Sequence, residues 1–380
     1  MCGIIGYIGS KNPVEILING LKSLEYRGYD SAGIALKEKD KIEVVKSIGK
    51  IVNLEEKLKN EELISSHLGI AHTRWATHGR PTVENAHPHT AGNVTLVHNG
   101  IIENAEELRE KLKNEGVSFY SETDTEVLAA LINQYYKKDP IEAITKALNE
   151  VKGSYALGIL FKDREDLYAV RKDSPLIIGI GKEENFIASD IAAIIDYTNQ
   201  YLLLEEGEIA HITKDTVEVI KDGKILDKKI QTTNLEKDAK DKCGYDHYML
   251  KEIMEEPVVL EKTFEPYLEH LEKLPDLTKY EEIHIVACGS AMYAGMIGKT
   301  LLEEYANTKA EIDVASEYRY KNIIYNKKTL VILISQSGET ADTIAAMRKA
   351  QEHKIDTLAI VNVKTSTIAR ESDQQIFIEA

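Results

Sequence analysis

The hydrophobic pattern of the first 220 residues predicts short strands around a few helices. Short apolar runs, most of them ended by Gly, Asp or Asn, are typical of strands. The runs that fit are 2–8, 31–37, 42–48, 68–74, 94–100, 154–161 and 175–181. Helices are expected from Asn104 to about Glu115, from Thr123 or Asp124 onward, and over 140–151 after Asp139 as N-cap. This mixture predicts an α+β domain, with sheets covered by helices.

A change of pattern separates this region from the rest of the chain. Residues 231–246 are polar and aperiodic, which is typical of a linker. Apolar residues then recur at helical spacing between Leu250 and Leu271, and we expect a break or kink at Pro257. The sequence therefore predicts one domain over 1–230, a linker over 231–246 and a second domain over 247–380.

The second domain has the pattern of an α/β fold. The apolar runs 283–288, 329–334, 357–363 and 375–380 read as buried strands, and helical segments lie between the first three. Buried strands that alternate with helices form parallel sheets. We therefore expect a doubly wound parallel sheet from about residue 280 onward.

Charge and cysteine usage exclude several classes of protein. The formal net charge of the 380 residues is −16, which argues against a nucleic-acid-binding surface. Three widely spaced cysteines, Cys2, Cys243 and Cys288, do not suit a disulfide framework and favour a reducing compartment. No basic segment precedes the first apolar run, and no run approaches the ~20 residues of a membrane span. We expect a cytoplasmic protein that binds neither membrane nor nucleic acid.

The second residue is the first candidate for chemistry. Removal of Met1 would give Cys2 a thiol and a free α-amine on the same residue. An α-amine has a pKa near 7.7–8.0, so it can accept the thiol proton and serve as general base. The alternative is a small buried hydrophobic residue near a terminus.

Asn99 and Gly100 are candidates for an oxyanion hole. The segment His98-Asn99-Gly100 ends an apolar run, and an Asn side chain with a Gly N–H can stabilise a developing negative charge. The alternative is a hairpin turn, for which Asn-Gly is a common signal.

Residues 71–89 concentrate polar groups that could bind a small molecule. Arg74 offers a planar fork for a carboxylate, and Asp124 near a predicted helix start is either an ammonium partner or only a cap. Four histidines in the segment raise the alternative of a metal site. The segment has no Cys and its only acid is Glu84, and its spacing matches no zinc pattern. We expect no metal and no cofactor.

The segment Ser335-Gln336-Ser337-Gly338-Glu339-Thr340 is a candidate phosphate site. It follows a buried strand and opens a helix, where backbone N–H groups and hydroxyls can surround an anion. The alternative is a helix that Ser and Thr simply cap. Residues 288–291 form a matching second turn.

Five of these segments together resemble a known family. The segments are 2–9, 24–35, 71–89, 98–104 and 121–127. They resemble the glutaminase domain of class II glutamine amidotransferases, which have an N-terminal nucleophile, and most closely the fructose-6-phosphate aminotransferase family. The resemblance implies a four-layer αββα glutaminase fold over 1–230.

The resemblance assigns roles to residues of this domain. Cys2 would be the nucleophile that forms a glutamyl thioester, and Asn99 with Gly100 would form the oxyanion hole. The residues expected to bind glutamine are Arg74, Thr77, His78 and Asp124. Trp75 would gate a path for ammonia, and Arg27 would help to order the site.

The second domain resembles the first sugar isomerase (SIS) domain of the same family. The resemblance implies that Ser290, Ser335, Gln336, Ser337 and Thr340 bind the phosphate of fructose 6-phosphate. The family's activity yields glucosamine 6-phosphate and glutamate, and the family implies a homodimer through the SIS region. Its second SIS lobe is expected to be absent from this chain, which would leave glutaminase activity and partial sugar-phosphate binding.

Two positions depart from the family, and two other functions remain open. Ala291 stands where the family has a serine, and Glu256 stands where it has a glutamine. Another class II amidotransferase would carry a diphosphate-binding acidic motif or a nucleotide loop in its second domain. A sugar-phosphate-responsive module without synthase activity would be marked by loss of Cys2 or Asn99.

Overall fold

The computed structural model describes residues 2–76, 79–233, 244–245, 247–364 and 366–379. The chain divides into two compact units, Met1–Asp241 and Lys242–Ala380. No helix among the described residues is both long enough and apolar enough to cross a membrane.

The first unit contains two antiparallel sheets. The eight-stranded sheet has the order β15-β11-β9-β10-β1-β4-β2-β3, and the seven-stranded sheet has the order β14-β13-β12-β8-β7-β6-β5. The strands of the first are β1 (Gly3–Gly9), β2 (Ser31–Glu38), β3 (Lys41–Ile48), β4 (Leu68–Arg74), β9 (Ile177–Ile180), β10 (Glu184–Ala188), β11 (Gln200–Leu203) and β15 (Gln231–Thr232). Those of the second are β5 (His89–Ala91), β6 (Val94–Ile102), β7 (Gly153–Phe161), β8 (Leu167–Lys172), β12 (Ile209–Ile212), β13 (Val217–Lys221) and β14 (Lys224–Leu226). β15 lies within the segment expected to be a linker and pairs with β11.

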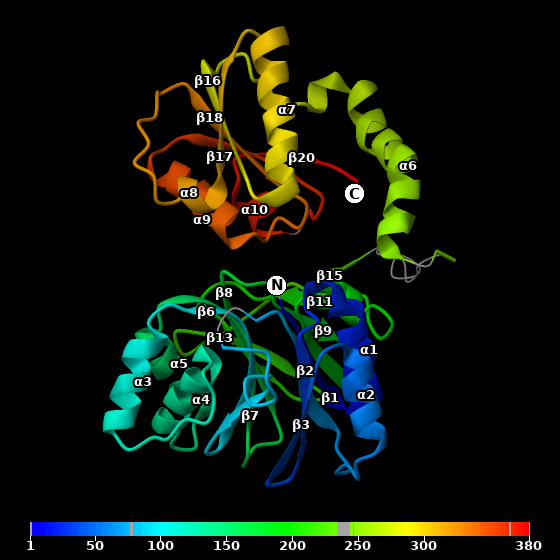
Figure 1. Ribbon diagram of the computed structural model, residues 1–380, viewed down its shortest axis with the longest axis vertical. Helices are drawn as coiled ribbons and strands as arrows, with labels where there is room; N and C mark the ends of the chain where they lie inside the picture. Colours follow the sequence, from blue (N-terminus) through cyan, green and yellow to red (C-terminus); the bar gives the residue numbers. More distant parts are fainter. Residues whose placement is uncertain (1, 77–78, 234–243, 246, 365, 380) are drawn as a thin grey trace. The chain divides into compact units, whose positions relative to one another are not determined.

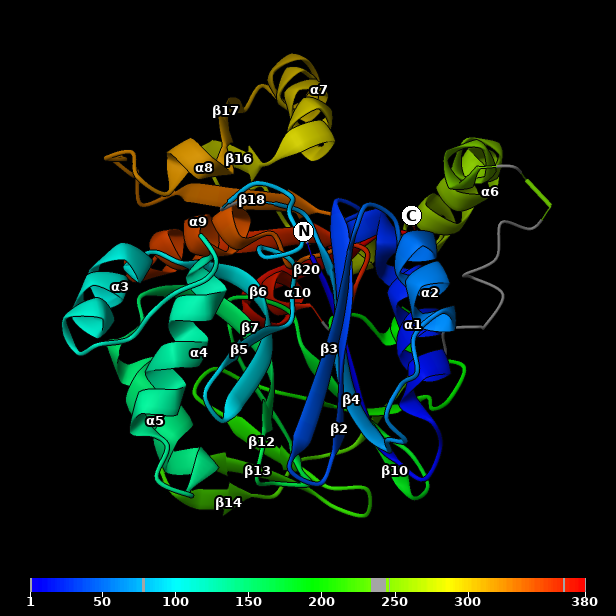
Figure 2. The same ribbon diagram turned by 60° about the horizontal axis from the view of Figure 1, so that its bottom comes forward.

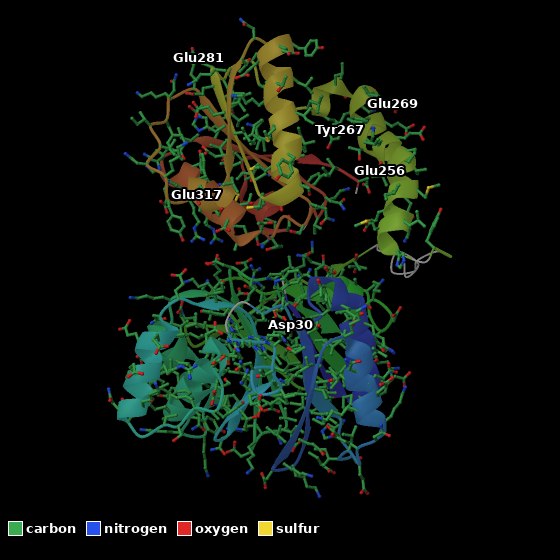
Figure 3. The ribbon with its side chains drawn as sticks, in the orientation of Figure 1. Asp30, Glu256, Tyr267, Glu269, Glu281 and Glu317 are labelled. Carbon is green, nitrogen blue, oxygen red and sulfur yellow. The ribbon has the colours of Figure 1, made fainter. Side chains whose placement is uncertain are left out.

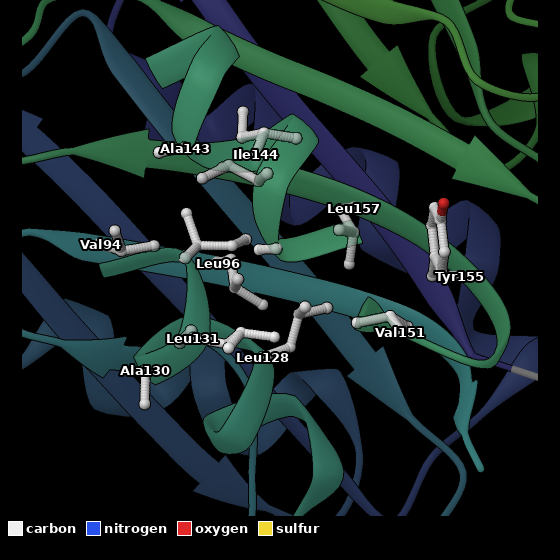
Figure 4. Close-up of a cluster of buried hydrophobic side chains, with 14 of the residues drawn as sticks. Val94, Leu96, Leu128, Ala130, Leu131, Ala143, Ile144, Val151, Tyr155 and Leu157 are labelled. Carbon is white, nitrogen blue, oxygen red and sulfur yellow. The ribbon is translucent and has the colours of Figure 1, made fainter. Parts of the chain in front are cut away.

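Three hydrophobic clusters show that this unit has four layers. One cluster packs α1 (Pro13–Leu24) and α2 (Ile51–Lys59) on the eight-stranded sheet. A second lies between the sheets and joins side chains of both. A third packs α3 (Ala105–Asn114), α4 (Asp124–Tyr135) and α5 (Pro140–Glu150) on the seven-stranded sheet (Figures 1, 2 and 4). The predicted αββα arrangement is thus confirmed.

The layers explain why β1 is a continuous apolar run. Successive side chains of a strand point to opposite faces of the sheet. Ile4 and Ile8 pack between the two sheets, whereas Ile5 and Tyr7 pack under the helices. Both faces of the strand are therefore buried, and alternation with polar residues is lost.

Two of the three predicted helix starts agree with the structure in their caps, and the third differs. Asp139 caps α5 through Glu142 N–H, with Pro140 in the first helical position, as predicted. Asn104 occupies the N-cap position of α3, but its side chain makes no cap bond; it bonds instead to the backbone of residues 150 and 152. Thr123, and not Asp124, caps α4. The carboxylate of Asp124 is thereby left for other contacts.

The second unit is built on a parallel sheet of order β17-β16-β18-β19-β20. Its strands are β16 (Glu282–Ala287), β17 (Lys309–Val314), β18 (Thr329–Ser335), β19 (Asp356–Val361) and β20 (Gln374–Phe377). α7 (Gly289–Tyr305) covers one face, where Gly295 fits closely against Ile285 and Ile312. α8 (Ala315–Tyr318), α9 (Ala341–Glu352) and α10 (Thr367–Glu371) contribute to the core on the other face. The predicted doubly wound sheet is confirmed.

A long helix, α6 (Tyr248–Leu268), precedes this sheet. Pro257 lies inside it, so the expected break does not occur there. Thr263 and Tyr267 hold α6 to residues 377–379, because Tyr267 Oη accepts the N–H of Phe377 at 2.8 Å and Thr263 Oγ1 accepts that of Glu379 at 2.9 Å. Tyr267 is labelled in Figure 3. Many apolar side chains of α6 are exposed, including Met249 and Leu268.

Candidate active site

Three strand ends bring the first site together at one edge of the eight-stranded sheet. Gly3, the first residue of β1, pairs with Thr73 near the end of β4, and Ile5 pairs with Ala188 at the end of β10. Because these strands are antiparallel, Cys2 before β1, Arg74 at the end of β4 and Ser189 after β10 lie at the same edge.

The thiol of Cys2 is held against the backbone of Trp75. Trp75 N–H donates to Cys2 Sγ at 3.2 Å. Burial raises the pKa of the thiol, and the carboxylate of Asp30 raises it further. The Trp75 N–H and the charge of Arg74 lower the same pKa but do not compensate. The resting group is therefore a thiol, which needs a base to become a nucleophile.

The loop that follows Arg27 fixes the backbone around this thiol. Thr73 Oγ1 donates to Gly28 O at 2.5 Å, and Asp30 N–H donates to Arg74 O at 3.1 Å. The carboxylate of Asp30, labelled in Figure 3, accepts the N–H of Ala76. A Cβ on Gly28 would lie 2.6 Å from the carbonyl carbon of Arg74, so only glycine permits this close approach.

The side chain of Asn99 contacts the backbone of Cys2. Its Nδ2 donates to Cys2 O at 3.0 Å and to Ser189 Oγ at 2.9 Å. Its Oδ1 lies 3.0 Å from His72 Nε2. The next residue, Gly100, has φ +134°, and a Cβ there would lie 2.1 Å from Ser154 O. The Asn-Gly pair therefore lies within the β6–β7 ladder, and the alternative of a hairpin turn is wrong.

A pocket opens beside these groups. It is lined by Cys2, Arg74, Trp75, His87, His98, Gly100, Thr123, Asp124 and Thr125. Arg74 and Asp124 are both buried and carry opposite charges, as a pocket for the α-carboxylate and α-ammonium of an amino acid requires. Thr77 and His78, the other two residues expected to bind glutamine, lie outside the described residues.

Backbone contacts hold the two charged groups in place. The guanidinium of Arg74 donates to the carbonyl oxygens of Gly79 at 3.3 Å and Arg80 at 3.4 Å. Asp124 Oδ2 accepts the N–H of Ile102 at 2.9 Å. Both side chains are therefore preorganised before any ligand arrives.

Trp75 lies at the pocket, and Arg27 contacts the segment that follows β10. The side chain of Trp75 is 49% exposed at the pocket and packs edge-on against Tyr29, with ring centroids 5.6 Å apart. Arg27 is buried and pairs with Asp190 at 2.8 Å. Asp190 directly follows Ser189, so Arg27 supports the segment that contacts Asn99.

His72, His87, His89 and His98 form a buried group, of which His87 and His98 line the pocket. His72 and His87 stack with centroids 4.0 Å apart, and His87 and His89 lie 4.9 Å apart. Burial lowers the pKa of His72 to about 3, and it lowers the pKa of His87 and His89 well below the usual value. Hydroxyls contact three of the rings, those of His87, His89 and His98. Among the described residues, no group of His, Cys, Asp or Glu has an arrangement suited to a metal ion.

The second candidate site lies at the carboxyl end of the parallel sheet. β16 and β18 are neighbours, and Ala287 pairs with Ile334, so the turns that follow the two strands lie side by side. The strand that follows β16 in the chain, β17, lies on one side of this pair, and the strand that follows β18, β19, lies on the other. The place between β16 and β18 is therefore the switch point of the sheet. Ligands of such folds bind at this place.

The turn after β18 is internally bonded, and the N-cap side chain of the helix that follows makes no cap bond. Ser335 Oγ accepts the N–H of Gly338 at 3.0 Å, and Ser337 Oγ accepts the N–H of Glu339 at 3.2 Å. Thr340 is the N-cap of α9 but makes no side-chain cap bond. The alternative to a phosphate site was a helix capped by Ser and Thr side chains, and the N-cap side chain of α9 makes no such bond. Gln336 is exposed in the same turn.

The turn after β16 presents a further hydroxyl at this edge. Ser290 is exposed in the first turn of α7, whose N-cap is Cys288. Ala291 follows Ser290 in the same turn and brings no hydroxyl. The other departure, Glu256, lies within α6 (Figure 3).

Comparison with known proteins agrees with this geometry. The family model of the glutamine amidotransferase domain matches residues 72–196, and that of the SIS domain matches residues 276–380. The chain carries a glutamine amidotransferase domain followed by a SIS domain.

Two named relatives are similar over nearly the whole of this chain. Glutamine–fructose-6-phosphate aminotransferase of Clostridium tetani is 50% identical over 99% of this chain. An enzyme of the same name from Thermus thermophilus is 44% identical over 100% of it. The chain spans 64% of the length of each of these two relatives.

A solved structure shares the fold. The phosphoribosylpyrophosphate amidotransferase of B. subtilis is 20% identical, with a TM-score of 0.53 over 99% of this chain and 90% of that chain. At this identity the likeness shows the fold alone.

Some residues at the amidotransferase pocket were not anticipated. Ser189 contacts Asn99 from 90 positions away in sequence, and no local signal marks it. His98, Thr123 and Thr125 lie next to predicted site residues in the sequence, but their own side chains were not predicted to line the pocket. His72 and His87 belong to the histidine-rich segment. That segment has only one acidic residue, Glu84, and so few carboxylates to pair with charged histidines are a signal for neutral, buried rings.

Proposed function

We propose that the amidotransferase domain hydrolyses L-glutamine with Cys2 as nucleophile. The observation that carries this proposal is one pocket that holds the Cys2 thiol, the Arg74 guanidinium and the Asp124 carboxylate. Arg74 binds the α-carboxylate of glutamine and Asp124 binds its α-ammonium. The side-chain amide of the substrate then points to the thiol.

The chemistry follows from the groups around the thiol. After Met1 is removed, the α-amine of Cys2 takes the thiol proton, and the thiolate attacks the amide carbon of glutamine. Asn99 Nδ2 and Gly100 N–H stabilise the oxyanion that forms. The intermediate collapses when the C–N bond breaks and the α-ammonium returns its proton to the leaving nitrogen, which releases ammonia. Water then cleaves the γ-glutamyl thioester to glutamate and regenerates the thiol.

We propose that the SIS domain binds fructose 6-phosphate at the turns after β16 and β18. Support comes from the switch-point position and from the hydroxyls of Ser290, Ser335, Ser337 and Thr340 at that edge. The first N–H groups of α9 face a site where the helix dipole favours an anion. Gln336 offers a further donor.

The whole activity is proposed from the two domains together. Ammonia from glutamine would be transferred to fructose 6-phosphate, giving glucosamine 6-phosphate and glutamate. The relatives that carry this name are longer than the present chain. We therefore expect these 380 residues alone to hydrolyse glutamine without forming glucosamine 6-phosphate.

We further propose a homodimer through the SIS domain and a cytoplasmic location. Apolar side chains are exposed on α6 and α7; Tyr305 is 82% exposed, and Met249 and Leu268 are each 72% exposed. Surfaces of this kind mark protein interfaces. The free thiols of Cys2 and Cys288 fit a reducing compartment.

The test is glutamate release from glutamine by this chain and by Cys2→Ala. Intact mass first shows that Met1 is absent from both proteins. Activity in the unaltered chain and its loss in Cys2→Ala would support the proposal. Equal release by both proteins would contradict it, and glucosamine 6-phosphate formed by this chain alone would contradict the expected division of activities.

A further inference from the structure

His72 contacts the amidotransferase site from behind the pocket. It lies on β4, is 0% exposed and is not among the residues that line the pocket. Its Nε2 is 3.0 Å from His98 O and 3.0 Å from Asn99 Oδ1. No substrate atom can reach it, so its influence must pass through Asn99.

The surroundings of His72 determine where its proton is. A backbone carbonyl only accepts hydrogen bonds, so the contact with His98 O requires a proton on Nε2. Nδ1 is buried without a hydrogen-bond partner among the described residues, and a proton there would be an unsatisfied buried donor. Nε2–H is therefore the donor, shared between His98 O and the side chain of Asn99.

This proton determines which way the amide of Asn99 faces. The end of the amide that meets a donor must be its oxygen. Nδ2 is consequently turned to the opposite side, toward Cys2 O and Ser189 Oγ. The hydroxyl of Ser189 can both donate and accept, so it could pair with either the nitrogen or the oxygen of the Asn99 amide. The carbonyl of Cys2 can pair only with the nitrogen, but that carbonyl belongs to the residue that reacts in the proposed mechanism.

We propose that His72 is a positioning residue, which fixes the Asn99 amide with its nitrogen toward the oxyanion of the glutamine intermediate. The inference rests on the proposed glutaminase function. The role requires a neutral ring with one donor. Burial, the main cause of the low pKa of His72, keeps the ring neutral at physiological pH.

Two substitutions at this position distinguish the effect of the hydrogen-bond donor from the effect of ring packing. His72→Gln puts an amide nitrogen near the place of Nε2 and can still donate to Asn99. His72→Leu fills a similar volume without a donor. We expect His72→Leu to lower kcat for glutamine hydrolysis about 10²-fold, the lower end of the effect of removing an oxyanion-hole donor. KM changes little, and His72→Gln recovers roughly tenfold or more of the lost kcat.

A second readout isolates the oxyanion from binding in general. The aldehyde analogue of glutamine, L-glutamate γ-semialdehyde, adds to the Cys2 thiol and gives a tetrahedral adduct whose oxygen occupies the oxyanion hole. Glutamate makes the same contacts with Arg74 and Asp124 but forms no adduct. We expect His72→Leu to weaken the aldehyde by about 10²-fold and to leave glutamate affinity nearly unchanged. Circular dichroism and thermal melting of both variants check that they are folded.

The outcomes distinguish His72 from the function on which it depends. Equal loss of kcat in the Leu and Gln variants would assign the effect to ring packing and overturn the inference. Parallel loss of aldehyde and glutamate affinity would overturn it as well. If His72→Leu behaves like the unaltered chain, only the role of His72 fails. If the unaltered chain neither hydrolyses glutamine nor binds the aldehyde, the proposed function fails and the inference falls with it.

Discussion

The side-chain nitrogen of Asn99 lies 3.0 Å from the carbonyl oxygen of Cys2. Its second hydrogen is directed to Ser189 Oγ at 2.9 Å, so both donor positions of the amide are used before a substrate binds. An oxyanion can gain this donor only by replacing or sharing one of the two acceptors. One of these acceptors, Cys2 O, belongs to the same residue as the thiol that we propose reacts. We expect glutamine to take over that hydrogen as the intermediate forms.

Asn99→Asp tests this donor directly. The carboxylate can still accept from His72, but it has no hydrogen to offer the oxyanion, and its charge opposes the developing one. We expect kcat for glutamine hydrolysis to fall by about 10²–10³-fold or more, with a much smaller change in KM. Steady-state kinetics measure both parameters. A rise in KM with kcat preserved would place Asn99 in ground-state binding instead.

The backbone requires a glycine at position 100. An added Cβ would lie 2.1 Å from Ser154 O in the neighbouring strand, and φ is +134°. We expect Gly100→Ala to disturb the β6–β7 ladder, destabilise the amidotransferase domain and abolish glutamine hydrolysis. Denaturant unfolding and activity assays measure the two effects. Gly116→Ala is the matched control, because Gly116 has φ +90° but no atom within 4 Å of an added Cβ. Equal behaviour of the two variants would show that the clash is relieved.

Much of the fold was predictable because the pattern of the long strands is simple. The seven predicted strands match β1, β2, β3, β4, β6, β7 and β9, which are four to nine residues long. Most of the strands that were missed have two to five residues, too few to show a period. The helical spacing of 250–271 correctly indicated a helix, but it could not show that α6 exposes its apolar residues.

The site was predictable in its residue types and only partly in its contacts. Cys2, Arg74, Gly100 and Asp124 were expected at the site, and they line one pocket. That Thr123 caps α4 and leaves Asp124 to bind Ile102 N–H depends on backbone geometry. The contacts of Asn99 with His72 and Ser189 depend on how the strands are paired and layered, which local sequence does not encode.

The buried histidines predict a loss of stability in acid. The folded-state pKa of His72, His87 and His89 lies below the ordinary value of about 6.5 because burial disfavours the charged form. The unfolded chain binds more protons below pH ~6.5, so the stability that these groups contribute is present above that pH. It decreases as pH falls toward the folded pKa, by about 1.4 kcal/mol per pH unit for each neutral ring.

Denaturant unfolding at pH 7.5 and pH 5.5 measures this loss, with the single tryptophan, Trp75, as a fluorescent reporter. We expect the free energy of unfolding to be lower at pH 5.5. His89→Gln removes one titrating ring that does not line the pocket, so it should reduce the difference between the two pH values. An equal free energy of unfolding at both pH values would contradict the neutral, buried state of these rings.

The alanine at position 291 leads us to expect that a serine there would strengthen sugar-phosphate binding by the SIS domain. It lies in the first turn of α7, beside Ser290, at the edge where we propose the phosphate binds. A serine there would add one hydroxyl to a charged ligand, and such a bond contributes about 1.5–3 kcal/mol. We expect Ala291→Ser to tighten fructose 6-phosphate binding by roughly 10- to 100-fold, measured by titration calorimetry. Fructose without phosphate is the control, because its affinity should not change. Unchanged affinity for the phosphate ester in Ala291→Ser would mean that the first turn of α7 does not contact the phosphate.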